Sequence, residues 1–135
     1  GWGTFQPIRH TTVEQHAMGA EFYRLPPAEA QIIQQAQRQG GRVVAIGTTS
    51  VRSLETAAAG GELAPYRGDT RLFIRPGYRF RVIDALLTNF HLPRSTLLML
   101  VAAFAGRERV LRLYREAIER GYRFYSYGDA MLLLP

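Results

Sequence analysis

The sequence predicts an α/β fold in which a mostly parallel sheet carries helices on both faces, in a Rossmann-like arrangement. Apolar segments of strand length alternate with segments of helical periodicity along the 135 residues. Two of the apolar segments, at residues 42–46 and 85–88, run through a short polar corner into a helix. Parallel strands require crossovers of this kind. Hydrophobic residues make up 47% of the chain, which is enough for one core, so we expect a single domain over residues 1–135.

The first half of the chain alternates extended segments with helices. Pro26 and Pro27 favour the start of a helix directly after them, and Gly40 with Gly41 favours its end. The elements predicted here are a capped turn at 11–16, an extended segment at 21–25, a helix at 28–39, a buried strand at 42–46, a turn at 47–50 and a helix at 51–59.

The second half is predicted to contain four strands and two helices. They are strands at 71–74, 78–83 and 85–88, helices at 96–105 and 107–120, and a strand at 122–127. The helix at 96–105 has no charged residue, yet at 1.5 Å per residue it spans only about 15 Å, roughly half the core of a bilayer. We therefore expect it to be buried within the protein and not to span a membrane.

Composition excludes several kinds of chemistry. The chain has no cysteine, which removes disulfides, thiolate nucleophiles and cysteine-ligated metals. All 17 basic residues are arginine, so a Schiff-base lysine and the lysine of a Walker phosphate loop are excluded as well. A genome-wide base bias is the simpler cause of this arginine content. The formal net charge of +6 nevertheless fits a polyanionic partner such as RNA.

The first candidate site is the polar corner between the strand at 85–88 and the apolar helix at 96–105. It contains Asn89, His91, Arg94 and Ser95, four side chains that bind anions or exchange protons, between two segments expected to be buried. Ser95 is placed to cap the helix, and the free N–H groups of its first turn would attract an anion. We therefore predict that this corner binds substrate.

The second polar corner consists of Thr48, Thr49, Ser50 and Arg52, which follow the strand at 42–46. The glycine pattern G-x-G-x-x-G is absent, which argues against pyrophosphate binding. A hydroxyl-rich helix N-terminus suits a carboxylate, a ribose or a single phosphate, although a plain helix cap with a solvated arginine explains the pattern equally well. Ligands bind beyond the carboxyl ends of parallel strands, so we expect both corners and Asp129 to converge.

The candidate general bases are His16, His91 and Glu21, because a base that works at neutral pH needs a pKa near that value. For a lone histidine the alternative is a ring hydrogen-bonded within a loop. No two of the three histidines have the i, i+4 spacing beside a carboxylate that is typical of zinc helices. We predict no metal site.

Arginine and aromatic side chains alternate between residues 66 and 81, and only Asp69 and the nearby Asp84 offset the positive charge. Unpaired arginines beside exposed aromatic rings suit the backbone and bases of single-stranded RNA loops. The same alternation is also typical of an ordinary half-buried strand. The candidate RNA-binding residues are Arg67, Arg71, Arg75, Tyr78, Arg79 and Arg81.

Six short strings of residues, in this order along the chain, are recognisable as a set. They are residues 3–7 (GTFQP), 46–55 (IGTTSVRSLE), 76–78 (PGY), 87–93 (LTNFHLP), 103–107 (AFAGR) and 127–131 (YGDAM). Together they resemble the S-adenosylmethionine:tRNA ribosyltransferase-isomerases of queuosine biosynthesis, from one end of the chain to the other. Six strings with natural spacing are far more specific than any single motif.

The resemblance implies a cytoplasmic bacterial enzyme. Such an enzyme moves the ribosyl part of S-adenosylmethionine onto 7-aminomethyl-7-deazaguanine at the tRNA wobble position, giving epoxyqueuosine in tRNA and releasing adenine and methionine. S-adenosylmethionine is then a consumed substrate, and no cofactor is expected. The family combines a β-barrel domain with an α/β domain. This chain is similar to the C-terminal part of that two-domain enzyme, with the β-barrel domain largely absent.

The chemistry implied by the resemblance fits both polar corners. S-adenosylmethionine offers a carboxylate, ribose hydroxyls and C–H bonds beside a sulfonium that a base would deprotonate. Which of His91, His16 and Glu21 acts as base and which as acid stays open. Two other classes are alternatives: a non-catalytic tRNA-binding module, and an S-adenosylmethionine-dependent RNA methyltransferase, which would ordinarily show a glycine-rich turn after its first strand.

Overall fold

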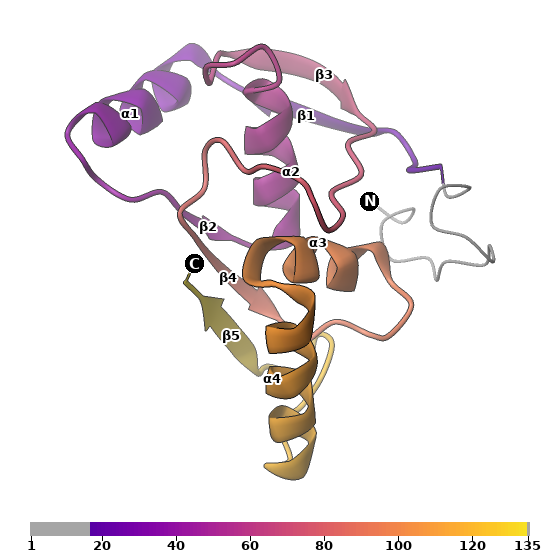
Figure 1. Cartoon of the computed structure of the whole chain (residues 1–135). Helices are drawn as coiled ribbons and strands as arrows, with labels where there is room; N and C mark the ends of the chain where they lie inside the picture. The colour runs from indigo at the N-terminus through magenta and orange to yellow at the C-terminus, as the bar shows by residue number, and fades with distance from the viewer. Residues whose placement is uncertain (1–16, 135) are drawn as a thin grey trace.

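The computed structural model describes residues 17–134, within which it has five strands and four helices (Figure 1). The predicted turn at 11–16, including His16, lies outside these residues. The elements are β1 (Glu21–Leu25), α1 (Pro27–Arg38), β2 (Val44–Ile46), α2 (Thr48–Ala57), β3 (Tyr66–Thr70), β4 (Ala85–Asn89), α3 (Thr96–Ala105), α4 (Arg107–Glu119) and β5 (Ala130–Leu133).

The strands form two small sheets. β2, β4 and β5 make a three-stranded sheet in that order, in which β2 and β4 are parallel and β4 and β5 are antiparallel. β1 and β3 form a separate antiparallel pair. Helix α2 contacts strands of both sheets and lies between them in Figure 1. The α/β class is thus confirmed, whereas the predicted mostly parallel sheet is only partly right, because one of the two pairs in the larger sheet is antiparallel.

Helices cover one face of the larger sheet, not both as predicted. Ala45, Leu86 and Leu133 share one face and are buried in the core. On the other face Val44 is 51% exposed, Ile46 70% and Leu132 58%. This chain therefore leaves one side of the sheet apolar and open to solvent.

The strands predicted at 71–74 and 78–83 are absent, and β3 precedes them at Tyr66–Thr70. For the segment at 78–83 the reason is a buried carboxylate. Glu55 on α2 accepts hydrogen bonds from the backbone N–H groups of Arg81, Val82 and Ile83, at 3.0 to 3.4 Å, which a sheet would otherwise use. The segment is an irregular loop, and its apolar side chains are buried because this loop packs on the core.

The strand predicted at 122–127 is also wrong. The chain there forms turns, and the strand comes later, as β5. Gly121 and Gly128 have φ angles of 71° and 113°, and Tyr125 between them has 66°. These left-handed conformations interrupt an extended chain.

Helix α3 is buried on one side only, although the whole helix was predicted to be buried. Leu100 and Val101 are enclosed, whereas Leu98 and Met99 are partly exposed. Ser95 caps the helix as predicted: its Oγ accepts a hydrogen bond from the N–H of Leu98 at 3.1 Å. Among residues 17–134, no helix is both long and apolar enough to cross a membrane.

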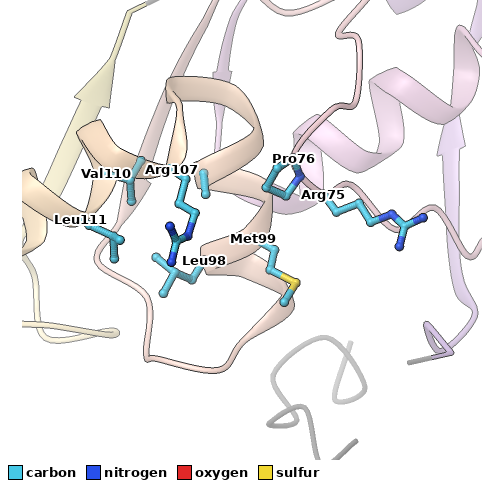
Figure 2. Close-up of a pocket in the computed structure, with 8 residues that line it drawn as sticks. Arg75, Pro76, Leu98, Met99, Arg107, Val110 and Leu111 are labelled. Carbon is cyan, nitrogen blue, oxygen red and sulfur yellow. The ribbon is translucent and has the colours of Figure 1, made fainter. Parts of the chain in front are cut away.

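The partly exposed side of α3 borders a groove of about 500 Å³ shared with α4 and residues 75–76. Figure 2 shows Arg107 lying between Leu98 and Leu111 in this groove, while the side chain of Arg75 points away from it. Apart from these two arginines, the groove is lined by apolar side chains, including those of Met99 and Pro76. It offers few of the hydrogen-bonding groups that a small polar ligand would need.

Candidate functional site

A smaller cavity, of about 310 Å³, lies at the carboxyl ends of the parallel strands β2 and β4. The structure brings residues from both predicted polar corners into its lining. The lining residues are Gly47, Thr48, Thr49, Thr88, Asn89, His91, Leu97, Tyr125 and Ser126. None of these side chains is charged, and five of them carry a hydroxyl group. The cavity therefore presents hydroxyl, amide and imidazole groups to a ligand.

The first side of the cavity is the turn from β2 into α2. The N–H of Gly47 donates to the carbonyl of Leu87 at 2.8 Å, which extends the pairing of β2 and β4 up to the cavity. Gly47 has φ 84°, a conformation that other residues adopt only with strain. This turn places Thr48 and Thr49 at the start of α2, where the N–H groups of the first helical turn attract negative charge.

The second side is the end of β4. The Nε2 atom of His91 lies 3.0 Å from the hydroxyl of Thr88, and the backbone N–H of His91 donates to the hydroxyl of Tyr114 at 2.8 Å. Burial lowers the pKa of His91 to about 4. The imidazole is therefore neutral at neutral pH, and it is a weak base.

The third side is the segment after α4. Asn89 donates through Nδ2 to the backbone carbonyl of Asp129 at 3.3 Å, which places this segment beside β4. The carboxylate of Asp129 binds Arg123 instead, and this pairing holds the pKa of Asp129 below its usual range. Asp129 thus meets the site through its backbone and not through its side chain.

Besides Asp129, five predicted site residues among residues 17–134 do not line the cavity: Glu21, Ser50, Arg52, Arg94 and Ser95. The hydroxyl of Ser50 donates to the carbonyl of Ile46 at 2.8 Å, Ser95 caps α3, and Arg94 is exposed on the turn before it. Arg52 is 2% exposed, forms an ion pair with Glu21 and donates from Nε to the carbonyl of Leu72 at 3.1 Å. Glu21 and Arg52 therefore link β1, α2 and the chain after β3, away from the cavity.

The sequence interpretation missed Thr88, Tyr125, Ser126 and Leu97 as cavity residues. Tyr125 and Ser126 were assigned to a strand. Their segment is anchored by aromatic rings: Phe124 packs against Phe90 with ring centroids 5.2 Å apart. A run of aromatic residues flanked by Gly121 and Gly128 was the available signal for a packed loop instead of a strand.

The candidate RNA-binding residues fall into two groups. Arg67, Arg71, Arg75 and Arg79 are exposed. Arg81 is exposed as well, but it donates to the carbonyls of Ala58 and Ala59, at 2.9 and 2.8 Å, at the C-terminal end of α2. Tyr78 donates its hydroxyl to Glu55 at 3.2 Å, and burial raises the pKa of Tyr78 to about 12. Arg81 and Tyr78 therefore hold the loop in place.

The sequence did not point to Arg24 as a candidate RNA-binding residue. Arg24 on β1 lies directly opposite Arg67 on β3 in the antiparallel register, and both side chains are exposed. Like charges at directly opposed positions repel each other. Among residues 17–134, no group of three or more histidine, cysteine, aspartate or glutamate side chains is placed to hold a metal ion.

The fold and the cavity define an α/β protein with a hydroxyl-lined site beyond a parallel strand pair. A family model described as queuosine biosynthesis protein matches residues 1–133, and the chain belongs to this family. An S-adenosylmethionine:tRNA ribosyltransferase-isomerase from Anaeromyxobacter dehalogenans is 61% identical over 134 residues, and one from Citrifermentans bemidjiense is 58% identical over 133. These matches cover 99% and 98% of this chain but 39% of each relative.

A solved structure shows the same fold. The S-adenosylmethionine tRNA ribosyltransferase of Thermotoga maritima superimposes with a TM-score of 0.80 at 56% sequence identity, over 84% of this chain and 40% of that one. The chain thus spans about two fifths of the length of the relatives that it matches.

Proposed function

We propose that this chain is part of an enzyme that transfers the ribosyl moiety of S-adenosylmethionine to tRNA and isomerises it. The acceptor is 7-aminomethyl-7-deazaguanine at the wobble position, and the products are epoxyqueuosine in tRNA, adenine and methionine. S-adenosylmethionine is consumed as a substrate, and no further cofactor is proposed. The observation that carries the proposal is the cavity where Thr48 and Thr49 meet Asn89 and His91, in a chain whose relatives are named for this reaction.

The lining of the cavity suits the nucleoside part of S-adenosylmethionine. Its volume of about 310 Å³ lies at the lower end of small-molecule sites, which run from roughly 300 to 1,000 Å³. Hydroxyls of Thr48 and Thr88 and the amide of Asn89 are groups that hydrogen-bond to ribose. The N-terminus of α2 favours the carboxylate or another electron-rich group of the ligand.

His91 acts in this proposal as a neutral hydrogen-bonding group. Because its pKa is about 4, it is not a cationic acid at neutral pH. A neutral imidazole fixed by Thr88 is able to orient a ribose oxygen and to stabilise charge that develops on it. Glu21, the second candidate base, is engaged with Arg52, and His16 remains the third candidate from the sequence.

Exposed arginines favour tRNA as the second substrate. Arg67, Arg71, Arg75 and Arg79 are open to solvent, and phosphate contacts by arginine supply much of the affinity of RNA-binding proteins. Arg24 joins this set because it lies opposite Arg67. A bound phosphate would relieve the repulsion between the two guanidinium groups. No observation favours a non-catalytic tRNA-binding module or a methyltransferase over the enzyme proposed here.

The activity belongs to a full-length protein that contains this chain. The relatives are about two and a half times as long, and the open apolar face of Val44, Ile46 and Leu132 is the kind of surface that further protein covers. The remaining part of such a protein is therefore proposed to pack on this face and to complete the site.

The test is the release of adenine. Full-length protein incubated with S-adenosylmethionine and with tRNA bearing 7-aminomethyl-7-deazaguanine should release one adenine per modified tRNA. Asn89→Ala should weaken S-adenosylmethionine binding. The control is Ser53→Ala, which removes a hydroxyl of α2 that does not line the cavity and should leave binding unchanged. If the full-length protein without substitutions releases no adenine, the proposed reaction is refuted.

A further inference from the structure

Tyr125 has an unusual backbone conformation beside the cavity. Its φ angle is 66°, in the left-handed region that costs a tyrosine conformational energy. Its N–H donates to the carbonyl of Phe90 at 2.7 Å. Phe90 stands between Asn89 and His91, so this hydrogen bond fixes Tyr125 directly against the end of β4.

Tyr125 is not one of the residues of the hydrophobic core. The neighbouring Phe124 makes the packing contacts of this segment, with its ring centroid 5.2 Å from that of Phe90 and 5.5 Å from that of Tyr114. Tyr125 is 39% exposed and lines the cavity. Glycine fills the other left-handed positions nearby, at 121 and 128. A strained residue that keeps a large side chain at a ligand cavity indicates a function for that side chain.

We infer that Tyr125 stacks on the adenine ring of S-adenosylmethionine. This inference rests on the proposed function of the cavity. Tyr125 carries the only phenol ring among the described residues of the lining, and the imidazole of His91 is held by the hydroxyl of Thr88. Aromatic stacking on a nucleobase is worth about 1–3 kcal/mol, which corresponds to roughly 5- to 150-fold in affinity. Tyr125 is thus a binding residue that positions adenine, the leaving group of the proposed reaction.

The experiment measures ligand affinity in the full-length protein by calorimetry, with S-adenosylmethionine and with adenosine. Tyr125→Asn removes the ring, and asparagine tolerates the left-handed conformation, so the variant should fold. We expect Tyr125→Asn to weaken both ligands by the same factor, at least 5-fold, and Tyr125→Phe to restore most of the affinity. Tyr127→Asn, at a 73% exposed tyrosine outside the cavity, should bind both ligands normally.

The outcomes separate this inference from the proposed site. Unchanged binding by Tyr125→Asn together with weakened binding by Asn89→Ala would overturn the stacking and leave the site in place. Unchanged binding by both variants would refute the site itself. A loss for S-adenosylmethionine without a loss for adenosine would mean that the ring faces the sulfonium cation instead of adenine, which also overturns the inference.

Discussion

Glu21 on β1 and Arg52 on α2 form an ion pair that is almost fully removed from solvent, with side-chain exposures of 14% and 3%. Arg52 also donates to the backbone of Leu72. Two residues that sequence reasoning assigned to catalysis and anion binding therefore connect the two-stranded sheet to the central helix. Their position makes them determinants of stability.

Replacing one partner of this pair should destabilise the fold strongly. Glu21→Gln removes the negative charge of this buried pair, and breaking a buried ion pair typically costs about 3–5 kcal/mol. Urea unfolding of the full-length protein should show this loss, and Glu29→Gln on the exposed surface of α1 serves as the control, with a change within about 0.5 kcal/mol. Equal stability of the two variants would show that the pair contributes nothing.

His91 should matter for turnover. His91→Ala removes the hydrogen-bonding side chain that we place beside the bound ribose and should lower ribosyl transfer by about 100-fold or more, as the loss of a group that stabilises developing charge does, measured as adenine released in a single turnover. Circular dichroism and S-adenosylmethionine affinity should stay near those of the unmodified protein. Normal turnover would make His91 a packing residue, held by Thr88 and Tyr114.

The lowered pKa of His91 also predicts a pH dependence of stability. Burial takes this pKa from 6.5 to about 4, so the unfolded chain binds more protons than the folded protein between these values. The stability linked to His91 is complete above about pH 6.5 and falls as the pH decreases toward 4. The loss across this window is about 3 kcal/mol.

Comparison with His91→Gln isolates this effect from that of other titrating groups. The urea midpoint of the variant should fall less between pH 6.5 and 4 than that of the unmodified protein. Parallel curves for the two proteins would show that the ring at position 91 is not buried in its neutral form.

The sequence predicted the elements with clear local signals and missed those set by distant contacts. Glycine and proline boundaries located the first helix, and Ser95 was recognisable as a cap. The segment at 78–83 has strand periodicity, but its backbone N–H groups donate to the carboxylate of Glu55, which lies more than twenty residues earlier in the chain. No local pattern reveals such a contact.

The candidate site shows the same limit. Thr48, Thr49, Asn89 and His91 were predictable because ligands gather at the carboxyl ends of parallel strands, and the parallel pair β2–β4 exists. Arg52 was wrongly expected in the cavity, because a short sequence interval does not say which side of a helix faces the ligand. Tyr125 enters the cavity through a left-handed turn, and a strand pattern conceals such a turn.

The facing arginines of the β1–β3 pair give the last prediction. Arg24→Gln with Arg67→Gln should weaken tRNA binding and reduce the slope of log affinity against log salt by about 1–2, because each phosphate contact contributes roughly 0.7–0.9. S-adenosylmethionine affinity should not change. Arg112→Gln with Arg115→Gln removes the same charge from exposed positions on α4. Both double variants remove two positive charges, and only the first is expected to remove phosphate contacts. An identical salt slope for the two would therefore mean that Arg24 and Arg67 contact no phosphate.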